Sequence, residues 1–178
     1  MPTPISHAAV GFAIGAWTAP RPPALRVCVA AAACAALPDI DFLGLPLRFP
    51  DTSPLAHRGI THSIFFAGVA ALVVAVVFFS DERWRARRTR IGLALGLALL
   101  SHGVLDALTT YSLGIGFFVP FSAQRFRFLW TPLGDPRGRL AGQLIQDALV
   151  VFLPATLIGW LGWRLRRRSL VPTTSPPG

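Results

Sequence analysis

The composition of this chain places it in a membrane. Its 178 residues are 53% hydrophobic and 14% charged, with a mean hydropathy of +0.55, whereas soluble domains carry about 25% charged residues. This excludes a soluble globular protein, and the length predicts one membrane-embedded domain over residues 1–168. The net charge of +9 comes from 17 arginines against eight acids. In so apolar a chain this charge indicates cytoplasmic loops and anionic lipid headgroups as partners, not nucleic acid.

Five apolar segments, taken in chain order, predict an all-α, multi-pass membrane helical bundle. The first two, residues 5–19 and 24–37, are short and suit a helical hairpin, whose helices are either partly inserted, covered by protein, or fully spanning. The prolines of the connector at residues 20–23 break the helix between them. The other three approach the roughly 20 residues that cross a bilayer, and they are residues 63–79, 91–108 and 144–163. Residues 169–178, rich in Pro, Ser and Thr, predict a disordered tail.

The arginines predict the orientation of the bundle. Eleven of them lie between the third and fourth segments, after the fifth, or around the first connector. They are Arg21, Arg26, Arg83, Arg85, Arg87, Arg88, Arg90, Arg164, Arg166, Arg167 and Arg168. The positive-inside rule makes this end cytoplasmic. The N-terminus and the loops at residues 39–62 and 109–143 are then expected on the outer side.

Seven ionisable residues fall at the ends of the apolar segments, all on the expected outer side. They are His7, Asp39, Asp41, His57, His62, His102 and Asp106. Ionisable groups near hydrocarbon are costly and usually mark a functional site, and His with Asp is a typical set of metal ligands. None of the seven was used to derive the topology, so their convergence on one side independently predicts a shared metal centre.

Each motif also has a simpler interpretation. His102 and Asp106 are four residues apart and share a helix face, which suits two ligands, a ligand with its orienting carboxylate, or a helix-end hydrogen bond. Asp39 and Asp41 follow Pro38, and in an extended segment they point the same way. Two such carboxylates favour a cation, although a polar turn among headgroups is the alternative.

His57 and His62 require a turn between them to share a ligand role, and Gly59 permits one. Their alternative is a helix cap with an incidental histidine. Arg58 between them could bind an anion such as phosphate. Residues 111–130 form an aromatic-rich interfacial loop that includes Arg125. This loop is either an anchoring belt or a substrate-facing lid with phosphate-binding arginines.

The ordered set of strings resembles a known family. The strings are an N-terminal His, Pro-Asp-x-Asp, His-Arg-Gly-x-Thr-His-Ser, Ser-His-x3-Asp and Pro-Phe-Ser-x2-Arg-Phe, which run from His7 to about Phe126. They resemble the YdjM-like family of bacterial inner-membrane proteins, described as metal-dependent hydrolases. The resemblance implies a multi-pass inner-membrane protein whose hydrolytic site comprises the seven His and Asp residues, with Arg58 and Arg125 as catalytic companions.

The number of candidate ligands bears on the cofactor. Seven exceed the three or four protein ligands of one zinc ion, which favours two ions or one ion with an outer layer of orienting residues. We therefore expect one or two divalent metal ions, most simply Zn²⁺. They would activate water for the hydrolysis of a lipid-linked ester or phosphodiester at the outer interface. The alternatives are a divalent-cation transporter and a non-catalytic protein with a structural metal. The sequence predicts no oligomeric state.

Overall fold

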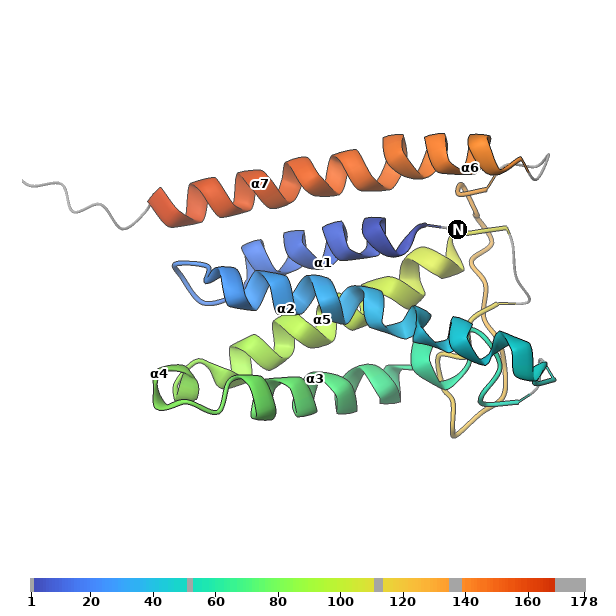
Figure 1. The fold of residues 1–178 in the computed structure, drawn as a ribbon, viewed down its shortest axis with the longest axis horizontal. Coiled ribbons are helices and arrows are strands. Elements are labelled where there is room, and N and C mark those ends of the chain that lie inside the picture. Colours follow the sequence, from blue (N-terminus) through green and yellow to red (C-terminus); the bar gives the residue numbers. More distant parts are fainter. Residues whose placement is uncertain (1, 51–52, 111–113, 135–138, 169–178) are drawn as a thin grey trace, which may run out of the picture.

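Long helices lie alongside one another and run alternately in opposite directions (Figure 1). The computed structural model describes residues 2–50, 53–110, 114–134 and 139–168. Its long helices are α1 (Pro4–Thr18), α2 (Leu25–Ala36), α3 (Ile64–Phe78), α5 (Arg88–Ala107) and a C-terminal helix. That last helix joins α6 (Leu140–Asp147), the π-helical turn η3 (Ala148–Phe152) and α7 (Leu153–Arg168). The predicted all-α bundle is confirmed, and the expected disordered tail lies outside the described residues.

Small residues allow the first two helices to pack closely as the predicted hairpin. A Cβ atom on Gly11 would overlap the carbonyl oxygen of Ala31, and one on Gly15 would lie 2.9 Å from the Cα atom of Cys28. Cys28 and Cys34 are free and buried. Because small side chains let helix backbones approach, the hairpin is held by close contact rather than by large apolar side chains.

Three stretches are long and apolar enough to cross a membrane, namely Leu25–Gly44, Arg88–Ala107 and Leu140–Arg167. The first is longer than the sequence predicted, because α2 continues into the 3₁₀ helix η1 (Leu37–Leu47). Pro38 has no N–H to bond back to the last turn of α2, and the carbonyl oxygen of Ala35 in that turn instead lies 2.7 Å from Nδ1 of His102. By contrast, the third predicted segment forms the 15-residue helix α3, which is shorter than a typical span.

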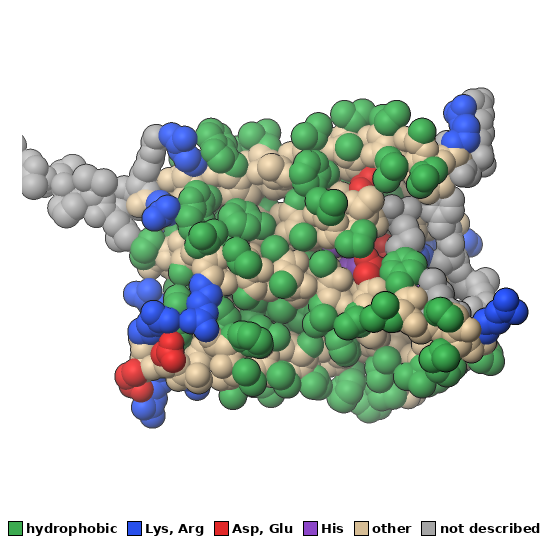
Figure 2. Space-filling model, in the orientation of Figure 1, with side chains coloured by type: hydrophobic (Ala, Val, Ile, Leu, Met, Phe, Trp, Pro, Cys, Tyr) green, Lys and Arg blue, Asp and Glu red, His purple; other side chains and the backbone are tan. Residues whose placement is uncertain are grey.

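The lateral surface of the bundle suits lipid rather than water. Helix α3 buries alanines, among them Ala71, and exposes Leu72 and Val73. Hydrophobic side chains cover the visible flank of the molecule, whereas arginines gather at the end that carries α4 (Glu82–Arg85) (Figure 2). Hydrocarbon accepts large apolar side chains, and close helix contacts favour small ones. The arrangement is that of a helical membrane protein.

Candidate metal centre

The elements that carry the predicted site residues meet at one end of the bundle (Figure 1), opposite the end where arginines gather (Figure 2). His7 is in α1 near its start, and His102 and Asp106 are in the last turns of α5. Asp39 and Asp41 belong to η1, and His62 ends the short 3₁₀ helix η2 (Ile60–His62). The antiparallel order of the helices brings these ends together, so residues far apart in the sequence become neighbours.

Four of the seven form a tight buried group. Asp39, His62, His102 and Asp106 each offer one ligand atom, and these atoms lie within 4.8 Å of one another. The Nε2 atoms of His62 and His102 are 3.0 Å apart. Nε2 of His102 is 3.4 Å from Oδ1 of Asp39, and Nε2 of His62 is 3.7 Å from Oδ2 of Asp106. The four side chains therefore surround a single small space.

The two carboxylates of this group are buried without hydrogen bonds. Within the described residues, neither oxygen of Asp39 and neither oxygen of Asp106 has a hydrogen-bond partner, although the guanidinium of Arg58 lies 3.0 Å from Oδ2 of Asp106. A buried carboxylate that lacks partners is costly unless a cation compensates it. Two imidazoles and two carboxylates are also a donor set that Zn²⁺ accepts. The group could therefore hold a divalent metal ion.

The two histidines of the group are oriented by contacts to their Nδ1 atoms, on the ring side away from the shared space. Nδ1 of His102 lies 2.7 Å from the carbonyl oxygen of Ala35, to which it can donate only in its Nδ1–H form. His62 presents Nδ1 to Oδ2 of Asp41 at 3.3 Å. Contacts of this kind fix the tautomer and leave Nε2 available to a metal. Both Nε2 atoms face the shared space, as this arrangement requires.

Burial lowers the pKa of His62, but the nearby carboxylates of Asp106 and Asp41 together outweigh burial and raise that pKa above its ordinary value. Histidine coordinates a metal only in its neutral form, so a metal ion at this position would oppose the upward shift.

Asp41 lies one layer outside the four-residue group. Its carboxylate accepts hydrogen bonds from the backbone amide of Arg58 at 3.0 Å and from Thr61 Oγ1 at 2.9 Å. It also lies 2.7 Å from Nδ1 of His57. The expected extended segment was wrong here: Asp39 and Asp41 lie in a 3₁₀ helix, in which residues two apart point in different directions. Asp39 accordingly faces His102, while Asp41 faces His57 and His62.

His7 completes the inner side of the centre. It is fully buried, and its ring stacks on that of His102 with the ring centroids 3.7 Å apart. Its Nε2 atom is 3.5 Å from Oδ1 of Asp106, and neither ring nitrogen has a hydrogen-bond partner. His7 is thus placed either to hold Asp106 or to add a further nitrogen ligand.

The two predicted arginines contact the centre differently. Arg58 is buried, has a φ of +64°, and places Nε 3.0 Å from Oδ2 of Asp106. The turn needs Gly59 after it, because a Cβ there would overlap backbone carbonyl oxygens. Arg125 instead donates from Nη1 to the carbonyl oxygens of His57 and Gly114, each at 3.2 Å. Arg58 touches a candidate ligand, whereas Arg125 holds the surrounding loop.

Sequence reasoning missed the supporting roles of Thr61 and the Ala35 carbonyl. Thr61 lies inside the His-Arg-Gly-x-Thr-His-Ser string, so its position was the available signal, although its contact with Asp41 was not. Asp147 makes a contact across the bundle. Its Oδ2 atom accepts from the Thr3 amide at 3.0 Å and from Ser6 Oγ at 2.7 Å, and it thereby holds the start of α1.

An apolar groove of about 460 Å³ lies beside the centre. Ala107, on its wall, directly follows Asp106, and Ile64 lies two residues after His62. The lining residues are Ile64, Ala107, Phe117, Phe118, Phe126, Arg127 and Phe128. The described part of the aromatic loop therefore contributes most of an apolar surface next to the buried polar group.

Two comparisons relate the chain to known proteins. A family model described as YdjM inner membrane protein matches residues 1–170. The chain is also 35% identical over 178 residues to "Inner membrane protein YbcI" of Escherichia coli (strain K12), an alignment that covers 93% of this chain and all of that relative. No solved structure matches the chain.

Proposed function

The chain belongs to the YdjM inner membrane protein family, and within that family we propose that it is a metal-dependent hydrolase of a lipid-linked ester or phosphodiester. One observation carries the proposal. Four buried donor atoms from Asp39, His62, His102 and Asp106 converge within 4.8 Å, and the two carboxylates accept no hydrogen bond from any residue that the structure describes. A divalent ion, with Zn²⁺ as the first candidate, would supply Lewis acidity and activate water for hydrolysis near neutral pH.

The surrounding residues have separate tasks in this proposal. Asp41 and the Ala35 carbonyl orient His62 and His102, so that each Nε2 atom faces the centre. Arg58 holds Asp106 in place, and its positive charge also favours an anionic substrate group nearby. Arg125 holds the backbone at His57 and Gly114, which keeps the loop against the centre.

The neighbouring groove supports a lipid-linked substrate. Its wall is built largely of phenylalanine side chains, which bind an acyl or prenyl chain better than they bind water. A chain in this groove would bring an ester or phosphodiester headgroup towards the polar centre. The distribution of arginines further supports an outer location for the centre, because the opposite end carries most of the positive charge.

The rival transporter hypothesis requires polar groups through the depth of the bundle. In the described part of the chain, the buried residues of the central layer are apolar, for example Ala31, Ala71 and Leu95. Apart from Arg166, the buried polar and charged side chains belong to the end that holds the centre. An ion would therefore find no polar path between the two ends. A structural metal is less favoured because an open apolar groove adjoins the centre.

Metal analysis followed by a hydrolysis screen tests the proposal. Purified protein should contain a stoichiometric divalent metal, and it should release product from at least one phospholipid or lipid-linked phosphate in a broad panel. A chelator should abolish that release, and restored metal should return it. Metal-dependent ion flux in reconstituted vesicles, with no product from any lipid in the panel, would overturn the hydrolase in favour of the transporter.

A further inference from the structure

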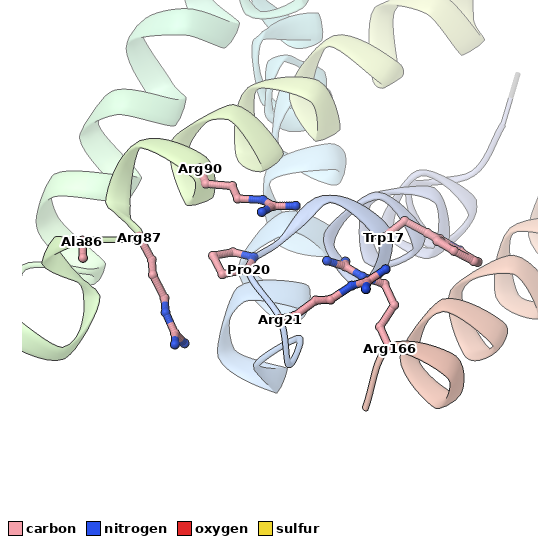
Figure 3. Close-up of a pocket in the computed structure, with 7 residues that line it drawn as sticks. All are labelled: Trp17, Pro20, Arg21, Ala86, Arg87, Arg90 and Arg166. Atoms are coloured by element: carbon pink, nitrogen blue, oxygen red, sulfur yellow. The ribbon is translucent and has the colours of Figure 1, made fainter. Parts of the chain in front are cut away.

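A second polar pocket lies at the end of the bundle opposite the metal centre. Its volume is about 640 Å³, and its lining includes Trp17 and four arginines, Arg21, Arg87, Arg90 and Arg166 (Figure 3). These arginines come from three separate parts of the chain: the α1–α2 connector, the start of α5, and α7. The fold therefore assembles the cluster, which is not a run of neighbouring charges.

The positive charge of this pocket is not balanced by acids. No Asp or Glu is among its lining residues in the described part of the chain. The acids in α4 and just before it pair elsewhere, Asp81 with Arg83 and Glu82 with Arg85. Such a concentration of like charge is unfavourable without an anion.

The carbonyl oxygens at the end of α1 compensate only part of this positive charge. Arg166 is buried and donates to the carbonyl oxygens of Ala16 and Ala19, each at 2.6 Å. Arg90 donates from Nε to the carbonyl oxygen of Thr18 at 3.0 Å. A helix C-terminus carries only about half a negative charge, which leaves roughly three and a half of the four arginine charges uncompensated. These contacts also fix two guanidinium groups in place before any ligand arrives.

The other two arginines have donors to spare. Arg21 and Arg87 are exposed, and within the described residues their side chains take part in no hydrogen bond or ion pair. Two fixed and two adaptable guanidinium groups suit a phosphate, whose oxygens accept paired N–H donors from arginine. The positive-inside rule explains why arginines gather at this end of the molecule. It does not explain why four of them converge on one pocket.

We propose that this pocket binds a phosphate group. The phosphate belongs either to the headgroup of a membrane lipid or to a soluble phosphate compound. Trp17 lines the pocket and is 43% exposed, and an exposed tryptophan of this kind is common at the headgroup level of a bilayer. The site is separate from the metal centre and does not depend on hydrolase activity.

Two double variants test the proposal. Arg21→Gln/Arg87→Gln removes two charges from the pocket. Arg164→Gln/Arg167→Gln removes two charges from the same end of the molecule, where these arginines lie over the rings of Trp160 and Trp163 instead. Isothermal titration of detergent-solubilised protein uses three probes: inorganic phosphate, dioctanoyl phosphatidylglycerol, and dioctanoylglycerol as the control without phosphate. Thermal unfolding shows that each variant is folded, and the single Arg87→Gln variant serves if the first double variant is not.

The wild type should bind at least one phosphate probe and should not bind dioctanoylglycerol. The pocket variant should bind that probe at least tenfold more weakly, because each lost guanidinium removes charge-assisted hydrogen bonds, while the control variant should stay within twofold. Binding of the lipid alone identifies a headgroup site, and binding of inorganic phosphate supports a soluble ligand. Equal losses in the two double variants, an unchanged pocket variant, or a wild type that binds neither phosphate probe would overturn the proposal.

Discussion

Replacing Asp39 by asparagine should remove most metal binding and leave the bundle folded. Asp39 is 7% exposed, and so is Asp147 at the same end of the molecule. The two aspartates therefore share residue type, burial and depth but differ in their partners. Asp39 faces His102 and has no hydrogen bond on either oxygen, whereas Asp147 holds Thr3 and Ser6. Asp147→Asn is thus the matched control.

The expected loss of affinity follows from the number of ligands. Structural zinc sites with four ligands are worth about 10–16 kcal/mol, so one ligand contributes about 3 kcal/mol, or roughly a hundredfold in affinity. The metal-free Asp39→Asn protein should be as stable as the wild type or slightly more so, because the substitution removes an uncompensated buried charge and breaks no hydrogen bond.

Asp147→Asn should show the opposite pattern. It weakens two hydrogen bonds to a buried carboxylate, which should lower the free energy of unfolding by about 1–3 kcal/mol. A chain of this size loses about 2–4 °C in Tm per kcal/mol. Its metal affinity should match that of the wild type, since Asp147 lies outside the group of converging donors.

Chelator competition measures the metal affinity of each variant, and thermal unfolding with excess chelator measures the stability of the metal-free protein. The reasoning would be refuted if Asp39→Asn bound metal as tightly as the wild type. It would fail equally if Asp147→Asn lost as much metal affinity as Asp39→Asn, because burial of an aspartate at this end would then explain both results.

Three further predictions address the layer around the centre and the topology. Asp41→Asn should weaken metal binding about 10–100-fold in chelator competition, because it removes the group that orients His62; an unchanged affinity would contradict the orienting role. Arg125→Lys should leave metal content intact but reduce turnover of the lipid identified in the screen about tenfold, since one ammonium cannot replace a planar guanidinium; loss of metal would instead make Arg125 part of the centre. With both native cysteines buried, Leu55→Cys should react with a membrane-impermeant maleimide in intact cells and Arg83→Cys only after permeabilisation, and the reverse result would invert the orientation.

The convergence of the site was predictable because it depends on topology alone. Antiparallel helices that follow one another must bring alternate ends together (Figure 1), so counting apolar segments was enough to place His7 and His102 at the same end, although not to predict that their rings stack. The arginine clusters marked the opposite end in the same way. Neither inference required knowledge of how any helix packs against its neighbours.

The partner that each site residue contacts was not predictable from sequence spacing. Asp39 and Asp41 were expected to point the same way, but α2 continues into a 3₁₀ helix and turns them towards different partners. Arg58 was expected to bind an anion, which stays a prediction; its position 3.0 Å from Asp106, after a backbone turn with positive φ, was not indicated by the spacing. Both outcomes depend on the path of the backbone at a helix end, which the packing of other segments decides.

The C-terminal helix influences the metal centre although the four converging donors all come from other elements. Asp147, at the end of α6, holds the start of α1 through Thr3 and Ser6, and Arg166 holds the end of α1 through two carbonyl oxygens. Helix α1 is therefore fixed at both ends by a helix that follows it by more than a hundred residues. Since α1 carries His7, which stacks on His102, the position of that ring in the centre depends on contacts made by the C-terminal helix. Arg166, near the end of α7, also lines the arginine pocket. Helix α1 therefore connects the two polar sites through an otherwise apolar bundle.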